Sequence, residues 1–418
     1  MLKTNIKKLL ENQLYYVIGK SHFYREKLKG RKISVSKFFE IELTTKDEII
    51  KDQIENPPFG KNLAVHKDKI LRIHKTSGTT SVPLIVALTK EDIKNTIKIG
   101  AMGFKSCGLK REDMVIHCLN YNMWAGGYTD HQSLECTGAA VIPYGVGNSV
   151  NLIEMILLLK PTAIHCTPSY LAKLEEIIKN NFNLRPIDLK LRLGLFGGES
   201  GLQNCNFRNY IETTWGFKAM NANYGVSEVL SMFGSECSFQ AGLHFMGEGV
   251  IFPEIIDISS KKSLPIERGV TGELVLTNLC KEAQPLIRYR TGDIVKIIDN
   301  DCLCKNNGFR FEIMGRRDDM FIVKGVNVFI NCIEEIIAEY LNSVTAVYYV
   351  LLKKEDPIDK FVLKVELRKE KTGEKEEIKE KIINDIKNKI GVKPDVEFVQ
   401  EGVLGRTEGK SKKIIRCL

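Results

Sequence analysis

Short apolar runs alternate with helical segments over the first half of the chain, and this pattern constrains its fold most strongly. Strand-like runs are expected near residues 114–119, 162–166, 191–196 and 218–221. The helical segments that separate them are expected at residues 90–102, 151–160, 168–179 and 203–214. Because strands and helices alternate, the strands should run mostly parallel in a doubly wound α/β sheet. Ligands of such sheets bind at the carboxyl ends of the strands.

The second half of the chain changes character twice. Residues 244–315 contain short β-like runs separated by turn residues, which predicts a β-rich subregion. A compact pattern of strands and helices then follows to the end of the chain. We therefore expect two domains, a large one over residues 1–317 and a small α/β one over residues 318–418.

Composition excludes several classes of protein. A hydrophobic content of 43% with 27% charged residues is typical of a soluble globular chain. The longest apolar runs are too short to span a bilayer, and residues 1–16 lack an apolar signal core, so we expect a cytoplasmic protein without membrane contact. The formal charge of +9 is spread along the chain among acidic residues, which favours anionic small molecules over nucleic acid as partners. Eleven cysteines, mostly within apolar stretches, do not indicate a disulfide framework.

Five short segments occur in a fixed order along the chain. They are residues 76–83 (TSGTTSVP), 224–228 (YGVSE), 288–293 (RYRTGD), 315–325 (GRRDDMFIVKG) and 405–410 (GRTEGK). Their order and spacing resemble the adenylate-forming, acyl-CoA synthetase-like enzymes, and most closely the phenylacetate–CoA ligase and coenzyme F390 synthetase branch. The resemblance implies an AMP-forming ligase that activates a carboxylic acid with ATP and then forms a thioester.

The first segment resembles the phosphate loop of that family. Backbone N–H groups and hydroxyls of such a loop face phosphate oxygens, and glycine permits their close approach. Ser81 and Val82 replace the glycine and lysine that are usual in the family, which removes a positive charge; whether this lowers activity is left open. The resemblance also gives Thr79 a catalytic role. The residues that it implies to bind ATP are Thr76, Ser77, Gly78, Thr79 and Thr80.

The second and third segments supply the implied nucleotide contacts. By resemblance Tyr224 stacks near adenine and Glu228 holds Mg²⁺, which requires a hard oxygen ligand. Asp293 accepts both ribose hydroxyls, since an ionised carboxylate offers two acceptor oxygens. Arg316 would reach the ribose or the α-phosphate. The other residues implied to line the cofactor site are Gly198, Glu199, Asn223, Gly225 and Ser227.

The last two segments carry lysines with separate implied roles. Lys410 would contact the carboxylate and the α-phosphate during acyl-adenylate formation, as a flexible point charge can. Asp318 matches the family hinge, at which a mobile small domain rotates after adenylation. Lys324 and Gly325 would then face CoA, with glycine allowing the thiol to approach.

The acid is expected to be aryl or arylacetic. Aromatic residues cluster at 120–128, and the expected pocket wall consists of Tyr121, Trp124, Tyr128 and Gly198. Aromatic side chains in this segment are equally compatible with ordinary core packing. The sequence does not identify the acid itself.

Four soft or borderline ligands flank the β-rich subregion. They are Cys237, His244, Cys302 and Cys304, and thiolate with imidazole favours tetrahedral Zn²⁺. From spacing alone unrelated cysteines are the better interpretation. Some phenylacetate–CoA ligase relatives carry similar segments, however, and with that resemblance we expect a closed, structural zinc site.

The acceptor of the activated group is left open by the sequence. CoA is the first expectation, and the phosphopantetheine of a carrier protein is an alternative. AMP transfer to a hydroxyl, as in coenzyme F390 synthetase, is another. An alternative from a different functional class is a protein that binds nucleotide without catalysing a reaction. Ser81 and Val82 motivate this alternative. A homodimer is also left open.

Overall fold

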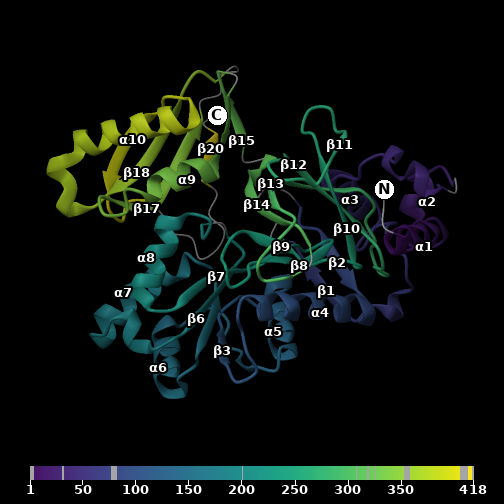
Figure 1. The fold of residues 1–418 in the computed structure, drawn as a ribbon, viewed down its shortest axis with the longest axis horizontal. Coiled ribbons are helices and arrows are strands. Elements are labelled where there is room, and N and C mark those ends of the chain that lie inside the picture. The colour runs from purple at the N-terminus through teal and green to yellow at the C-terminus, as the bar shows by residue number, and fades with distance from the viewer. Residues whose placement is uncertain are drawn as a thin grey trace. The chain divides into compact units, whose positions relative to one another are not determined.

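The structure, a computed structural model, separates into two compact units (Figure 1). The large unit comprises Met1–Gly198 with Ile211–Glu312, and the small unit comprises Glu199–Tyr210 with Ile313–Leu418. The predicted boundary at residue 318 lies outside the described residues and stays a prediction. The described residues are 4–30, 33–76, 82–199, 201–306, 308–317, 320–324, 326–352, 358–404 and 413–416.

Parallel strands form one part of the main sheet, as the alternating pattern predicts. In spatial order they are β4 (Ala140–Ile142), β3 (Met114–His117), β5 (Ala163–Cys166), β6 (Leu193–Gly197) and β7 (Lys218–Val226). Helices lie on both faces of these strands (Figure 1), namely α4 (Lys90–Ser106), α5 (Ala125–Cys136), α6 (Ser149–Leu159), α7 (Tyr170–Phe182) and α8 (Cys205–Trp215). The expected doubly wound α/β fold is therefore confirmed.

The same sheet continues as an antiparallel region beyond β7. From β7 outward the strands are β8 (Leu230–Ser235), β9 (Leu243–Phe245), β14 (Arg310–Arg316), β13 (Tyr289–Asp299), β12 (Thr271–Asn278), β10 (Ile251–Ile256) and β11 (Ser263–Leu264). Strand β7 thus belongs to both regions, since it pairs parallel with β6 and antiparallel with β8. This places the β-rich subregion directly beside the strand ends at which a ligand is expected.

The remaining elements of the large unit pack around the antiparallel region. They are α1 (Thr4–Lys20), α2 (His22–Lys27), α3 (Lys46–Glu55) and the hairpin of β1 (Arg72–Lys75) with β2 (Ile85–Leu88). Apolar residues of α1, such as Leu10 and Leu14, are buried in one cluster with Leu279 and Ile287. Within the described part of the chain, no helix has both the length and the apolar character needed to cross a membrane.

Helix α4 begins at a capping box that also ties it to the β-rich region. The backbone N–H of Asp92 donates to the Thr89 hydroxyl, and the Asp92 carboxylate accepts the N–H of Thr89. The same carboxylate accepts the backbone N–H groups of Glu282 and Ala283, at 2.8 and 3.0 Å. One buried carboxylate therefore fixes both the helix start and the segment after residue 280.

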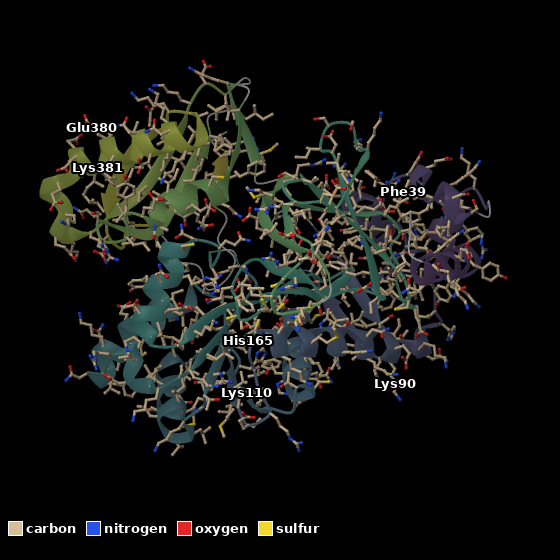
Figure 2. The ribbon with its side chains drawn as sticks, in the orientation of Figure 1. Phe39, Lys90, Lys110, His165, Glu380 and Lys381 are labelled. Atoms are coloured by element: carbon tan, nitrogen blue, oxygen red, sulfur yellow. The ribbon has the colours of Figure 1, made fainter. Side chains whose placement is uncertain are left out.

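The small unit has its own sheet and core. Strands β19 (Asp395–Gln400), β18 (Phe361–Leu367), β17 (Val344–Leu352) and β20 (Ile414–Arg416) form the sheet, next to α9 (Ile330–Ala338), α10 (Lys375–Ile390) and the hairpin of β15 (Met320–Val323) with β16 (Val326–Phe329). Along α10 the isoleucines at 378, 382 and 386 are buried at four-residue intervals. Glu380 and Lys381 extend from the opposite, exposed side (Figure 2). The many charged residues of the segment 368–381 therefore include a solvated helix face.

Candidate active site

Residues 224–228 form the end of β7 and the tight turn into β8. A Cβ atom on Gly225 would lie 2.0 Å from the carbonyl oxygen of Ser231, so only glycine fits there. The backbone N–H of Val229 donates to the carbonyl of Val226 at 2.9 Å and closes the turn. The turn presents Glu228 at the start of β8, at the edge of the sheet where the sequence predicts the nucleotide.

The Glu228 carboxylate is held by groups from distant parts of the sequence. Its side chain is 12% exposed, the Tyr289 hydroxyl donates to its Oε1 at 2.6 Å, and Lys46 Nζ lies 3.8 Å from the same oxygen. Behind it, Lys281 Nζ donates to the Glu228 carbonyl at 2.5 Å. Burial lowers the pKa of Lys281 to about 8, against the opposing effect of the Asp92 and Glu228 carboxylates. Sequence reasoning missed Tyr289, Lys46 and Lys281, because they lie on β13, at the start of α3 and after β12, and only tertiary folding brings them to this turn.

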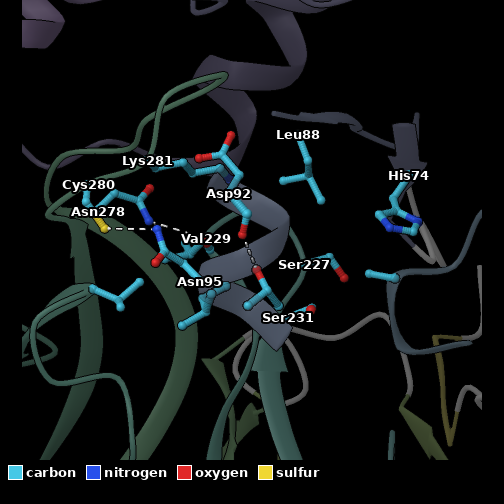
Figure 3. A pocket seen from close by; sticks show the side chains of 14 residues that line it. His74, Leu88, Asp92, Asn95, Ser227, Val229, Ser231, Asn278, Cys280 and Lys281 are labelled. Atoms are coloured by element: carbon cyan, nitrogen blue, oxygen red, sulfur yellow. Dashed lines mark hydrogen bonds between the residues drawn. The ribbon is translucent and has the colours of Figure 1, made fainter. Parts of the chain in front are cut away.

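A small cavity lies behind the same turn (Figure 3). It has a volume of about 20 Å³, which is room for about one water molecule. Figure 3 shows Lys281, Asn278 and Cys280 along one side and His74 on the opposite side, with Ser227 near it. Burial, helped by Arg72, lowers the pKa of His74 to about 4, so its imidazole is neutral at pH 7. The cavity is too small for an aromatic acid and belongs to the support of the turn.

Tyr224 and Asp293 meet although 69 residues separate them. The Tyr224 hydroxyl donates to Asp293 Oδ2 at 2.7 Å, and the Tyr224 ring makes edge contacts with Phe233 and Phe311. Asp293 lies on β13 and is 6% exposed, and its backbone N–H donates to the Thr291 hydroxyl at 3.0 Å. The structure thus brings together the two residues that the resemblance assigns to adenine and ribose.

The phosphate loop is described only at its base. Thr76 is 5% exposed, its N–H donates to the Leu84 carbonyl, and its hydroxyl accepts the Leu84 N–H, both at 3.0 Å. These two bonds hold the ends of the loop together. Just before it, the Lys75 N–H and the His74 ring both bond to the Met123 carbonyl, at 2.9 and 3.2 Å. The predicted loop residues outside the described part of the chain are Ser77, Gly78, Thr79, Thr80 and Ser81.

Two members of the expected acid wall lie against each other. Gly197 at the end of β6 is paired with Asn223 on β7, and the next residue, Gly198, has a positive φ of 82°. A Cβ atom on Gly198 would lie 3.3 Å from the Trp124 ring, so glycine leaves room for the indole. Trp124 immediately precedes α5. The strand end, the indole and the nucleotide turn therefore share one region.

The other two aromatic residues of the expected wall, Tyr121 and Tyr128, both contact His131. The Tyr121 hydroxyl bonds to His131 Nδ1 at 3.0 Å. Tyr128 is 44% exposed, and its ring lies between His131, stacked at 6.2 Å, and the Arg72 guanidinium, 4.5 Å from the ring centroid. Tyr128 is therefore a surface residue in a cation–π contact, whereas Tyr121 and Trp124 lie closer to the strand ends.

A buried group of polar side chains contacts the segment that carries these aromatic residues. His117 Nε2 donates to the Gly127 carbonyl at 2.8 Å, and its Nδ1 lies 2.8 Å from His165 Nδ1, with the two rings stacked. Burial lowers the pKa of His117 to about 4 and that of His165 well below its usual value. Asp130 accepts a hydrogen bond from Asn223, while burial raises its pKa well above the ordinary value. His165 lies in the interior in Figure 2.

Several predicted residues belong to the small unit. Glu199, Arg316 and Lys324 lie there. Lys324 has a positive φ of 49° in the tight turn between β15 and β16, where Val323 is paired with Val326. The predicted residues of this unit that lie outside the described part of the chain are Asp318, Gly325 and Lys410.

The four predicted metal ligands converge in the large unit. All ligand atoms of Cys237, His244, Cys302 and Cys304 lie within 4.8 Å of one another. Cys237 Sγ is 3.8 Å from Cys302 Sγ, and Cys304 Sγ is 3.4 Å from His244 Nε2. A tetrahedral Zn²⁺ with ordinary bond lengths would place two sulfurs about 3.8 Å apart, and sulfur and nitrogen about 3.6 Å apart. The donor set and its spacing therefore fit zinc.

Comparisons with known proteins identify the family of this chain. The family of AMP-binding enzyme C-terminal domains matches residues 325–416. The phenylacetate–coenzyme A ligase of Pseudomonas putida is 33% identical over 366 residues, covering 86% of this chain and 81% of that protein. The corresponding ligase of Aromatoleum evansii is 34% identical, covering 87% of this chain and 82% of that protein.

Solved structures share the fold over nearly the whole chain. A 2-hydroxyisobutyryl-CoA ligase in the postadenylation state matches with a TM-score of 0.88 at 23% identity, covering 99% of this chain and 89% of that chain. The same ligase in the thioesterification state, with its adenylate and CoA, matches with a TM-score of 0.70. The resemblance noted in the sequence is thus confirmed. This chain belongs to the phenylacetate–CoA ligase branch of the adenylate-forming superfamily and is an AMP-forming acid–CoA ligase.

Proposed function

We propose that the acid activated by this ligase is aryl or arylacetic. The observation that carries the proposal is the pairing of Gly197 with Asn223, which sets the Trp124 indole against Gly198 beside Tyr224. The face of an indole is a flat apolar surface against which an aromatic ring can pack. The relatives named as phenylacetate–CoA ligases support the same class of substrate.

We propose that the nucleotide lies along Tyr224 and Asp293. Adenine would contact the Tyr224 ring, and the Asp293 carboxylate would accept the ribose hydroxyls while it keeps the Tyr224 hydroxyl as a donor. Glu228 fits Mg²⁺ because it is a nearly buried carboxylate that retains acceptor capacity beyond its bond to Tyr289. The metal would supply charge neutralisation of the phosphates at this position. Lys281 holds the turn from behind and so fixes where Glu228 is presented.

We propose separate roles for the lysines of the C-terminal domain, which we place at residues 318–418. Lys410 would stabilise negative charge on the α-phosphate during adenylation. A rotation at Asp318 would then replace Lys410 with Lys324 and Gly325. The left-handed backbone of Lys324 supports this, because it lies where the chain reverses between the paired residues Val323 and Val326.

We propose a structural zinc ion at Cys237, His244, Cys302 and Cys304. The cluster connects the segment after β8, strand β9 and the loop between β13 and β14, so the ion would crosslink three parts of the antiparallel region. A full set of four protein ligands leaves no open position for substrate, which supports a structural role. Such an ion would stabilise the sheet that carries Asp293.

Pyrophosphate release with ATP, Mg²⁺ and a panel of acids tests the proposal. The panel should include benzoate, phenylacetate and short aliphatic acids, each with and without CoA. We expect release with aryl or arylacetic acids that increases with CoA, because thioester formation clears the adenylate. Selective release with aliphatic acids would contradict the proposed acid class. Release that CoA leaves unchanged would instead favour a carrier protein as the acceptor.

A further inference from the structure

The segment that carries Lys410 is held in the small unit at both of its ends. On its C-terminal side, β20 pairs parallel with β17, and the Val350 N–H donates to the Lys413 carbonyl at 2.7 Å. On its N-terminal side, β19 ends at Gln400, and the chain makes a turn over residues 401–404. How this turn is held determines where the lysine segment begins.

A single buried carboxylate holds that turn. Glu366 lies on β18 and is 0% exposed. Its Oε1 accepts the backbone N–H groups of Gly402 and Leu404, at 3.1 and 2.8 Å. Its Oε2 accepts the Thr345 hydroxyl at 2.9 Å. One side chain in the centre of the sheet thus bonds two backbone groups that lie 36 and 38 residues further along the chain.

The partners of Glu366 differ from those of two other buried glutamates, Glu254 and Glu273. Glu254 and Glu273 form ion pairs with Arg288 and Arg290, at 2.9 and 2.5 Å. The described partners of Glu366 are instead two backbone N–H groups and one hydroxyl. A buried carboxylate is costly unless its oxygens accept hydrogen bonds, and bonds to a charged acceptor are about twice as strong as neutral ones. The N–H groups of Gly402 and Leu404 therefore stabilise the buried charge, and the same two hydrogen bonds hold the turn in place.

We propose that Glu366 is a positioning residue for the adenylation half-reaction. This inference rests on the role proposed above for Lys410. By fixing Gly402 and Leu404, Glu366 sets the starting point of the segment that delivers the lysine, six residues after Leu404. Misplacing a catalytic group by about 1 Å can cost on the order of 100-fold in rate. Thioester formation does not use Lys410 and should not depend on this anchor.

The test compares the two half-reactions in three variants of the full-length protein. Adenylation is measured as acid-dependent pyrophosphate release, and thioester formation is measured from a supplied acyl-adenylate and CoA. Glu366→Leu removes every acceptor, and Glu366→Gln keeps one acceptor oxygen for the turn. Thr345→Val leaves the bonds to the turn in place and removes the hydroxyl on the opposite side of the carboxylate, which also accepts the Val347 N–H at 3.2 Å. Thermal unfolding of each variant is recorded in parallel.

We expect Glu366→Leu to slow adenylation by about 30-fold or more, while thioester formation stays within about twofold of the wild type. Glu366→Gln should lie between, and Thr345→Val should retain most adenylation. Equal losses in both half-reactions would overturn the inference, because they would mean a general structural role, and so would unchanged adenylation in Glu366→Leu. A wild-type protein that releases no pyrophosphate with any acid would refute the proposed function itself, and the inference with it.

Discussion

We predict that the stability of Lys281→Met relative to the wild type depends on pH. The unfolding free energy of the variant minus that of the wild type should be larger at neutral pH than at pH 10.5. Lys281 is 7% exposed, and its ammonium group donates to the Glu228 carbonyl. Burial lowers its pKa from the ordinary value of 10.5 to about 8, although the Asp92 and Glu228 carboxylates act in the opposite direction. Methionine has a similar length and no charge to desolvate.

The sign and size of the effect follow from proton linkage. Below pH 8 both the folded and unfolded states carry the charge, and the folded state bears the full desolvation cost. Between pH 8 and 10.5 the folded state releases its proton before the unfolded state does, so this residue makes stability rise with pH. Above pH 10.5 both states are neutral and the cost is gone. A pKa difference from 10.5 to about 8, at about 1.4 kcal/mol for each pH unit, gives roughly 3 kcal/mol.

Urea unfolding of the wild type and Lys281→Met at several pH values from 7.5 to 10.5 measures this directly. The difference in unfolding free energy between the two proteins should change by about 3 kcal/mol over that range. Buried tyrosines also affect stability at alkaline pH, but they are common to both proteins and cancel. Lys94→Met serves as the control, because the Lys94 side chain is 71% exposed, and its difference from the wild type should not vary with pH. A pH-independent difference for Lys281→Met would refute the reasoning.

Three further predictions concern the site itself. Tyr224→Phe should raise the KM for ATP by about 10-fold, because Asp293 loses a hydroxyl donor at 2.7 Å; steady-state kinetics with an unchanged KM would contradict this. Metal analysis should find about one zinc per chain, and Cys304→Ser should lose it together with several degrees of Tm; a metal-free wild type of equal stability would disprove the site. Trp124→Ala should lower kcat/KM for phenylacetate at least tenfold more than for acetate, and equal losses would remove Trp124 from the acid wall.

The parallel part of the fold could be predicted from sequence because its signals are local. Apolar runs at residues 162–166 and 191–196 became β5 and β6. The helix predicted to begin at Pro168 begins instead at Tyr170, because residues 168 and 169 form a turn. Helix α5 was missed altogether. Its first turn contains Gly126 and Gly127, which have low helix propensity, so the local sequence gives little sign of a helix.

The sequence motifs could assign expected roles to single residues but not the contacts between them. Tyr224 and Asp293 were identified separately, and their hydrogen bond across 69 residues follows from the order of β7, β8 and the strands beyond them. Tyr289, Lys281 and Glu366 could not be found in this way. Each acts through a contact with a distant segment, and residue type alone does not distinguish a buried glutamate that anchors a turn from a solvated one.

The carbonyl of Met123 links the acid wall to the phosphate loop. It accepts hydrogen bonds from the Lys75 N–H and the His74 ring, immediately before the loop, and Trp124 is the next residue along the chain. If the acid and the nucleotide bind as proposed, an acid that fits badly and displaces the indole would also displace the base of the predicted phosphate loop. Poor substrates should then be rejected during turnover rather than at binding. Such an enzyme would bind an ill-fitting acid but would seldom adenylate it, so little ATP would be consumed.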